Sequence, residues 1–181
     1  VDGVLVGSIY ALGAIGLTMV MHMLRFANFS HAELLSVGAY IALVFDRLFT
    51  SLVPVLATKI GPLSMTVALS LAMFVSMALT AASAVVIDRL VFRRIRQRGD
   101  MLLMVFASFG VALILRNVIG LIFGLGTTLY SKDIAFAVII SVDPLILVRP
   151  DQIAVLGVAL VLMLALHFVL SRTIFGYALR A

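Results

Sequence analysis

The polar side chains that could do chemistry in this chain gather in one short stretch, RFANFSHAELLSVGAY, which runs from Arg25 to Tyr40. Its first nine residues hold a cation, an amide, a hydroxyl, an imidazole and a carboxylate, and strongly apolar runs flank the stretch on both sides. Such a set can recognise a polar solute, gate a pathway, form an active site or begin a helix. The groups concerned are Arg25, Asn28, Ser30, His31 and Glu33.

Part of this polarity is typical of a helix start. Ser30 followed by Glu33 fits the S-x-x-E capping box, with Phe29 and Leu34 at the hydrophobic-staple positions. The carboxylate of Glu33 also suits the positive end of the helix dipole. We therefore predict that Ser30 and Glu33 cap a helix. This leaves three polar residues as candidates for a translocation path or gate: Arg25, Asn28 and His31.

Catalytic and metal chemistry find little support in the sequence. His31 and Glu33 echo the H-x-E of zinc deaminases, but the chain has no cysteine to complete such a site. His22 and His31 do not have the H-E-x-x-H spacing of a zinc site, and there is no Walker A sequence for ATP. Adjacent Ser30 and His31 do not by themselves supply a nucleophile and base. We expect no catalytic residue, metal or cofactor in this chain.

The composition is that of an integral membrane protein. Of 181 residues, 64% are hydrophobic and 12% are charged, with a mean hydropathy of +1.28, whereas soluble domains are roughly 45–50% apolar. The net charge of +5 comes mostly from cations beside apolar runs, so we attribute it to membrane orientation and expect no nucleic-acid partner.

Five apolar segments are long enough to cross a bilayer as helices. We therefore expect an all-α polytopic transmembrane bundle, with a short hairpin or surface-lying element between the last two spans, in 124–152. The predicted spans are about 3–24, 31–56, 63–87, 101–123 and 153–170.

The loop 88–100 fixes the expected orientation, because it holds five arginines against two aspartates and the positive-inside rule places it in the cytoplasm. Alternation then puts the N-terminus outside, and the 25–33 insert and the C-terminal end inside. Two roles for the arginines stay open: contact with an ATPase subunit, or orientation together with binding of anionic lipid.

The insert 25–33 also leaves two structural alternatives open. From Ser30 to Asp46 there are about 16 residues, or ~24 Å of helix, so a helix that begins at the surface reaches a charge before it has fully crossed. Either the helix tilts and Arg47 snorkels outward, or the insert dips into the bilayer as a re-entrant segment lining a pathway.

Charges within the spans suggest an ion pair. Asp46 lies 16 residues after Ser30, and Arg116 lies 16 residues after Asp100, on spans of the same direction. We hypothesise that Arg116 meets Asp46 at similar depth, with Asn117 adjacent, since intramembrane charges usually pair or face a wet cavity. The alternative is a local pairing of Asp46 with Arg47. All three, Asp46, Arg116 and Asn117, join the candidates for the path.

The stretch GSIYALGAIGLTMVMHMLRFANFSHAELLSVGAY resembles the opening of the permease subunits of branched-chain amino acid ABC transporters (Liv type, H-like subunit), with a G-x-x-Y-A-L-x-A-x-G-L helix, an N-F-x-H-G-E segment and a G-A-Y. The arginine-rich loop, SFGVALILRNVIGLIFG and RTIFGYALRA extend the likeness over essentially the whole chain. Ala32 departs from the family, which usually has glycine there. The matching residues are Gly7, Tyr10, Ala11, Leu12, Gly16, Leu17, Asn28, Phe29, His31, Glu33, Gly38, Ala39 and Tyr40.

This resemblance implies an ABC importer subunit of the bacterial inner membrane that forms part of the path for branched-chain amino acids. It implies a second permease subunit, two cytoplasmic ATPase subunits and an extracytoplasmic substrate-binding protein as partners, within the lipid bilayer. Residues 1–181 would be the N-terminal part of one permease domain, since the family's ATPase-contacting loop follows the R-A pair. Alternatives are an importer of urea, amides or other amino acids, or a self-sufficient secondary transporter using Asp46 or His167 for coupling.

Overall fold

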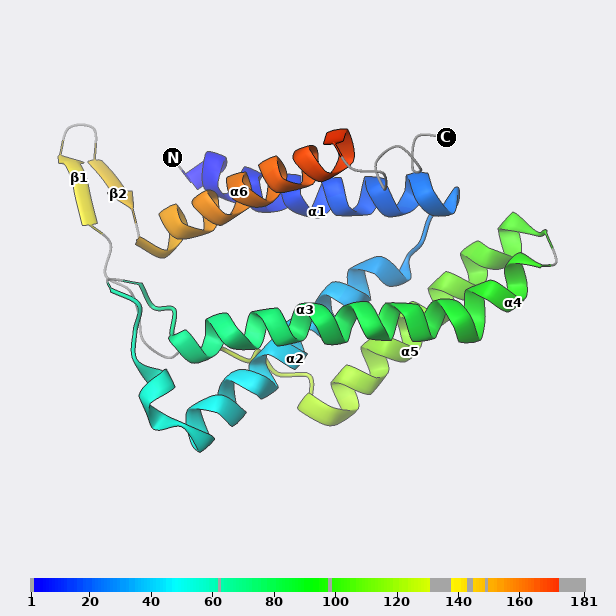
Figure 1. Cartoon of the computed structure of the whole chain (residues 1–181), viewed down its shortest axis with the longest axis horizontal. Coiled ribbons are helices and arrows are strands. Elements are labelled where there is room, and N and C mark those ends of the chain that lie inside the picture. The colour runs from blue at the N-terminus through cyan, green and yellow to red at the C-terminus, as the bar shows by residue number, and fades with distance from the viewer. Residues whose placement is uncertain are drawn as a thin grey trace. The chain divides into compact units, whose positions relative to one another are not determined.

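The computed structural model is predominantly helical, with one small hairpin (Figure 1). It describes residues 2–61, 63–97, 99–130, 138–142, 145–148 and 150–172. This confirms the predicted all-α class. The elements in chain order are α1 (Asp2–Leu24), α2 (Ser30–Leu52), a 3₁₀ turn η1 (Pro54–Ala57), α3 (Val67–Ile87), a π-helical turn η2 (Asp88–Phe92), α4 (Arg93–Arg96), α5 (Met101–Phe123), β1 (Val138–Val142), β2 (Leu145–Val148) and α6 (Pro150–Arg172).

Among the described residues, four helical stretches are long and apolar enough to cross a membrane: Ser30–Leu52, Val67–Arg96, Met101–Phe123 and Pro150–Arg172. Helix α1 is 23 residues long and contains a shorter apolar stretch, Val6–His22. These helices correspond to the five predicted spans, and the chain is a multi-pass membrane protein.

Local chemistry shifts the predicted helix boundaries by a few residues. Helix α2 ends at Leu52 rather than near residue 56, because Pro54 begins the 3₁₀ turn η1. Helix α3 begins at Val67, where the Thr66 hydroxyl accepts the Leu69 N–H at 3.1 Å. Helix α5 begins after Asp100, whose carboxylate accepts two backbone N–H groups of the first turn.

The predicted loop 88–100 is mostly helix, which corrects the sequence-based interpretation. After Ile87 the chain continues through η2 and α4 to Arg96, and Gly99, with φ of 72°, reverses the chain. The segment contains no proline or glycine before Gly99, and arginine is a good helix former, so nothing ends the helix at Asp88. An ion pair between Arg96 and Asp88, at 3.1 Å, spans the π-helical turn.

The chain divides into two compact units, 1–19 with 61–64 and 133–181, and 20–60 with 65–132. The first contains α6 and the antiparallel hairpin β1–β2, which is the first of the two alternatives, hairpin or surface-lying element, expected between the last two spans. In that unit the Asp151 carboxylate accepts hydrogen bonds from the backbone N–H of Ser64 at 2.8 Å and from its hydroxyl at 2.7 Å.

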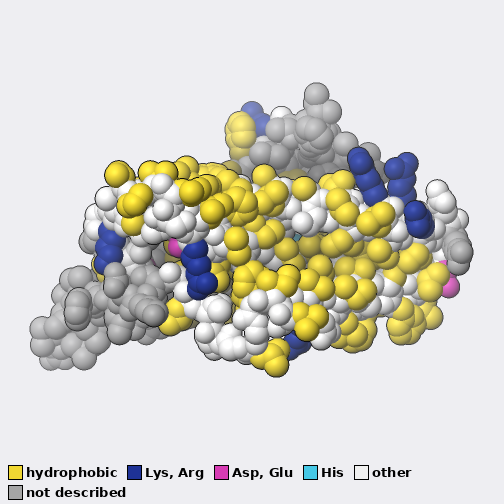
Figure 2. Space-filling model, turned by 90° about the horizontal axis from the view of Figure 1, so that it is seen from below, with side chains coloured by type: hydrophobic (Ala, Val, Ile, Leu, Met, Phe, Trp, Pro, Cys, Tyr) yellow, Lys and Arg dark blue, Asp and Glu magenta, His cyan; other side chains and the backbone are white. Residues whose placement is uncertain are grey.

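In the second unit α2 packs against α3 and, over a smaller surface, against α5. Small buried residues hold α2 close to α3, including Ala42 on one helix and Ala68 and Ala72 on the other. Exposed hydrophobic side chains are also spread along the face shown in Figure 2. Exposed apolar helix faces are expected where the surroundings are lipid or other membrane helices.

Candidate functional site

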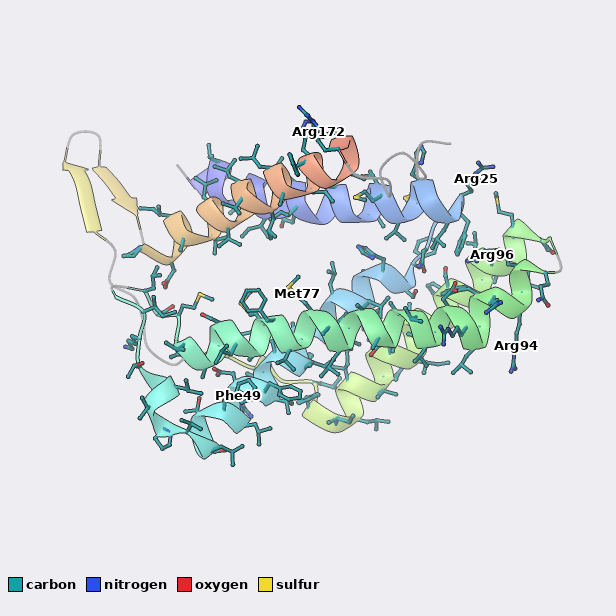
Figure 3. All side chains as sticks on the ribbon, in the orientation of Figure 1. Arg25, Phe49, Met77, Arg94, Arg96 and Arg172 are labelled. Atoms are coloured by element: carbon teal, nitrogen blue, oxygen red, sulfur yellow. The ribbon has the colours of Figure 1, made fainter. Side chains whose placement is uncertain are left out.

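The chain breaks its helical path between α1 and α2, at residues 25–29. Helix α1 ends at Leu24, and the next residue, Arg25, has φ of 59° and donates its N–H to the Met21 carbonyl at 2.9 Å. Among the described residues, Arg25 is the only one other than glycine with a positive φ. A left-handed conformation costs a side chain such as arginine about 1–2 kcal/mol. Figure 3 shows the Arg25 side chain extending away from the end of α1.

Helix α5 supports the broken backbone through one buried serine. The Phe29 N–H donates to the Ser108 hydroxyl oxygen at 3.2 Å. That hydroxyl donates to the Val105 carbonyl at 2.7 Å, and its oxygen also lies 3.4 Å from the Ala27 carbonyl. Ser108 has no exposed surface. A protein side chain thus supplies the hydrogen-bond partner of the Phe29 N–H at the break.

Aromatic side chains fix the break on both sides. The Phe26 ring is 5% exposed and lies 5.8 Å from the ring of Phe92 in η2, in a cluster completed by Met104. The Phe29 ring meets Phe109 of α5 edge to face, with centroids 6.2 Å apart. Two separate apolar contacts thus position the short segment that contains Asn28.

The break lies well along α5 rather than at its end. Ser108 is the eighth residue of α5, so the break is about 10 Å from the helix start at 1.5 Å per residue. If α5 spans the membrane from Met101, the insert dips into the bilayer, which is the re-entrant alternative. Non-helical backbone at such depth is tolerated where protein buries it or a cavity adjoins it.

Asn28, rather than Ser30 with Glu33, caps α2, which corrects the capping-box prediction. The Asn28 side-chain oxygen accepts the Ser30 N–H at 3.2 Å and the Ser30 hydroxyl at 2.6 Å. Its carbonyl accepts the His31 N–H at 3.3 Å. Phe29 already has helical backbone angles, so the capping side chain is that of Asn28, one residue earlier. The buried Ser30 hydroxyl acts as a donor to it. Glu33 stays in the first turn, where its charge suits the helix dipole.

A cavity of about 610 Å³ adjoins the helix break, and we call it the break cavity. Helix α1 contributes Leu24 to its wall, α2 contributes Leu34, and η2 contributes Phe92. Most of the wall surface is therefore hydrocarbon, and a limited number of polar groups lie within it. The polar and charged residues of the wall are Asn28, Ser30, His31, Asp88, Arg89, Arg93 and Arg96.

The electrostatics of the break cavity favour an anionic group. The positive charge of Arg96 is compensated by the carboxylate of Asp88 in an ion pair. Arg89 and Arg93 have no carboxylate partner in the described part of the chain. The N-terminus of α2 adds the positive end of its dipole beside Asn28. A carboxylate would meet guanidinium groups that can bind it with two hydrogen bonds.

The structure brings Asn28 and His31 together in this cavity and leaves the other four candidates outside its wall. The Asp46 carboxylate accepts a hydrogen bond from the Thr66 hydroxyl at 3.4 Å, and Asn117 donates to Leu113 of its own helix at 2.7 Å. Arg116 is exposed. In the described residues, Asp46 and Arg116 form no ion pair.

The offset between α2 and α5 explains why the predicted Asp46–Arg116 pair is wrong. Equal residue counts do not give equal depth in these two helices, because Phe29 at the start of α2 lies beside Ser108, the eighth residue of α5. Farther along, Tyr40 stacks on Phe123 at the end of α5, with ring centroids 4.4 Å apart. Asp46 therefore lies beyond the end of α5, past the level of Arg116.

The G-A-Y triplet of α2 has a structural role that the sequence did not reveal. A Cβ at Gly38 would lie 3.0 Å from the Thr80 Oγ1 of α3, and the Ser76 hydroxyl donates to the Gly38 carbonyl at 2.5 Å. The Tyr130 hydroxyl donates to the Ala39 carbonyl at 2.5 Å. With the Tyr40 stacking, the triplet joins α2 to α3, to α5 and to the segment after α5.

Comparison with known proteins agrees with this architecture. Residues 1–181 match the family described as branched-chain amino acid transport system / permease component. The high-affinity branched-chain amino acid transport system permease protein BraD of Pseudomonas aeruginosa is 29% identical over 189 residues, covering 100% of this chain and 57% of BraD. The corresponding LivH proteins of Salmonella typhimurium and Escherichia coli are 29% and 28% identical, covering 74% of this chain and 39% of each relative.

The chain thus spans little more than half the length of the first of these relatives and less than half of the other two. No solved structure matches it significantly. Since the family match covers every residue, and the helices form a multi-pass membrane protein, this chain belongs to the family of permease components of branched-chain amino acid transport systems.

Proposed function

We propose that this chain is part of the permease subunit of an ABC importer for branched-chain amino acids, and that the break cavity is a section of its translocation path. The observation that carries the proposal is the juxtaposition of Asn28 and His31 with Arg89 and Arg93 around one cavity at a buried helix break. Broken helices that adjoin cavities are a recurring way for transporters to expose backbone dipoles to a substrate.

The chemistry of the break cavity suits the substrate class named for the relatives. An aliphatic amino acid carries a hydrocarbon side chain and a carboxylate, and the cavity offers an apolar wall with two unpaired guanidinium groups. His31 and the Asn28 amide supply hydrogen-bonding groups at the N-terminal end of α2. A neutral solute such as urea would make no use of Arg89 and Arg93.

The remaining parts of the importer are supplied by other chains in this proposal. They are a second permease subunit, two cytoplasmic ATPase subunits and an extracytoplasmic substrate-binding protein. The arginine-rich end of α3 to α4 faces the cytoplasm, as the positive-inside rule requires, and the N-terminus lies outside. ATP hydrolysis takes place on the ATPase subunits.

The test is uptake of labelled leucine by cells that express the whole transporter, with intact or inactivated ATPase subunits. We expect uptake to require ATPase activity, and His31→Ala to reduce it while the complex still assembles. His22→Ala is the matched control, because His22 is an exposed histidine outside the cavity wall. Uptake that persists without ATPase activity would overturn the importer assignment in favour of a secondary transporter.

A second comparison tests the cavity itself. Arg93 is part of its wall, whereas the neighbouring Arg94 is not and extends away from α4 (Figure 3). We expect Arg93→Gln to raise the apparent KM for leucine about tenfold, the effect of losing one charge-assisted interaction, and Arg94→Gln to leave it unchanged. Equal changes in the KM for the two substitutions would show that leucine uptake depends on positive charge near the membrane and not on the wall of the break cavity.

A further inference from the structure

Two further cavities adjoin the middle of α2, and Tyr130 lies between them. The first, which we call the apolar cavity, has a volume of about 360 Å³, and the second, the threonine cavity, about 250 Å³. Only Ala39 and Tyr130 belong to both walls. The remaining residues of the first wall are Gly38, Ala42, Leu69, Met73, Ser76 and Met77.

The apolar cavity exists because α2 presents small residues to α3. Gly38, Ala39 and Ala42 leave space that larger side chains would fill, and Met73 and Met77 of α3 form the opposite wall. Methionine is flexible and polarisable, so it adapts to aliphatic groups of different shape. Figure 3 shows Met77 extending outward from α3 rather than into a packed core, and it is 63% exposed.

The threonine cavity has the complementary chemistry. Thr127 and Thr128 bring hydroxyl groups to its wall, and the Tyr130 hydroxyl donates to the Ala39 carbonyl there. Burial raises the pKa of the Tyr130 phenol, and the nearby Asp46 and Tyr40 raise it further, so the phenol keeps its proton.

We propose that the apolar and threonine cavities together form a binding site for a zwitterionic aliphatic amino acid. The hydrocarbon side chain occupies the apolar cavity against Met73 and Met77. The ammonium and carboxylate groups occupy the threonine cavity, with the Ala39 carbonyl accepting from the ammonium and the threonine hydroxyls donating to the carboxylate. This inference rests on the proposed function, and it locates a substrate site at a place separate from the break cavity.

Tyr130 must move for this site to fill. The Tyr130 hydroxyl already donates a hydrogen bond to the Ala39 carbonyl, and the Tyr130 side chain lies between the two cavities. An incoming ammonium group can replace the phenol as donor to that carbonyl, which releases Tyr130 and joins the cavities. The walls of the apolar cavity and the break cavity share no residue, so the two sites are separate in this conformation.

The experiment compares uptake of leucine and alanine by the whole transporter carrying Met77→Phe. The larger ring narrows the open side of the apolar cavity, so we expect the leucine-to-alanine uptake ratio to fall about tenfold, the scale on which one or two methylene groups are discriminated. Leu71→Phe is the matched control, because Leu71 is an exposed residue of the same helix outside both cavity walls. Its ratio should equal that of the unmodified transporter.

A second variant tests the polar half of the site. Tyr130→Phe removes the donor to the Ala39 carbonyl and keeps the ring. We expect it to lower the KM for leucine, because the ammonium no longer competes with a phenol for that carbonyl. As a control for assembly, the detergent-purified Tyr130→Phe complex must contain its subunits in the same ratio as the unmodified complex.

The outcomes separate this inference from the proposed function. If the unmodified transporter imports leucine but Met77→Phe and Leu71→Phe give the same leucine-to-alanine ratio, the site is wrong and the importer assignment stands. If the unmodified transporter imports no amino acid, both are overturned. A lowered ratio with Met77→Phe alone, together with a lowered KM in Tyr130→Phe, supports the site.

Discussion

The backbone N–H of Phe29 donates to the hydroxyl of Ser108 at 3.2 Å, across 79 residues of sequence. This contact joins the break between α1 and α2 to the middle of a spanning helix. It determines where the polar insert lies relative to α5, and therefore which groups share a cavity with Asn28 and His31.

Ser108→Ala should destabilise the complex by about 1–3 kcal/mol, the cost of leaving a buried N–H without an acceptor. We expect a lower thermal unfolding midpoint in detergent and reduced leucine uptake. Ser83→Ala is the control, because the Ser83 hydroxyl bonds only to the Leu79 carbonyl of its own helix. Equal midpoints for the two variants would contradict a supporting role for Ser108.

Two substitutions of Asn28 separate its capping role from its role in the path. Asn28→Ala removes the acceptor of both Ser30 hydrogen bonds and should cost about 0.5–2 kcal/mol. Asn28→Asp retains an acceptor and suits the helix dipole, so the complex should assemble with a near-normal unfolding midpoint. The added charge in the break cavity should nevertheless impair uptake of leucine. Normal uptake by the aspartate variant would reduce Asn28 to a helix cap.

Gly38→Ala should destabilise the α2–α3 contact, because the new Cβ would lie 3.0 Å from Thr80 Oγ1. Overpacking of this kind costs about 1–3 kcal/mol. Thr80→Ala removes the obstructing atom, so the double variant should recover most of the loss in thermal unfolding, a coupling that a double-mutant cycle measures. Gly110→Ala serves for comparison, since nothing lies within 4 Å of a Cβ at that position. It should be neutral or stabilising.

Thr80→Val tests the same contact from the other helix. In the described structure the Thr80 hydroxyl is buried without a hydrogen-bond partner. Replacing it by a methyl group of similar shape removes an unsatisfied donor, so the unfolding midpoint should stay equal or rise. A clear fall would mean that the hydroxyl has a partner in the assembled transporter.

Arg25→Gly should raise the stability of the complex by about 1 kcal/mol, because glycine adopts the left-handed conformation at φ of 59° without strain. Arg25→Lys keeps the cation and the strain and should leave the midpoint unchanged. Uptake by the glycine variant then reports whether the charge at this position has a role in transport. An unchanged midpoint in Arg25→Gly would show that the conformation carries little strain.

Local chemistry was sufficient to predict the helices and the membrane class. The 25 uncharged residues of 63–87 and the apolar runs beside them permit little else in a bilayer. The polar insert was also identified from residue types alone. The capping prediction failed because Asn28 and Ser30 both offer side-chain oxygens near the helix start, and only the backbone angles of Phe29 decide which one accepts.

The sequence by itself determined the helical class, the approximate spans and the family, since these depend on apolar length and on motifs read along the chain. Only the tertiary structure decided that α5 is offset from α2, that Ser108 supports the break, and that Arg89 and Arg93 line the same cavity as Asn28 and His31. The reason is physical: an apolar helix can slide along its neighbour with little change in buried hydrocarbon, so its register depends on a few contacts between distant residues. The hydrogen bond from Phe29 to Ser108 and the fit of Gly38 against Thr80 are two such contacts.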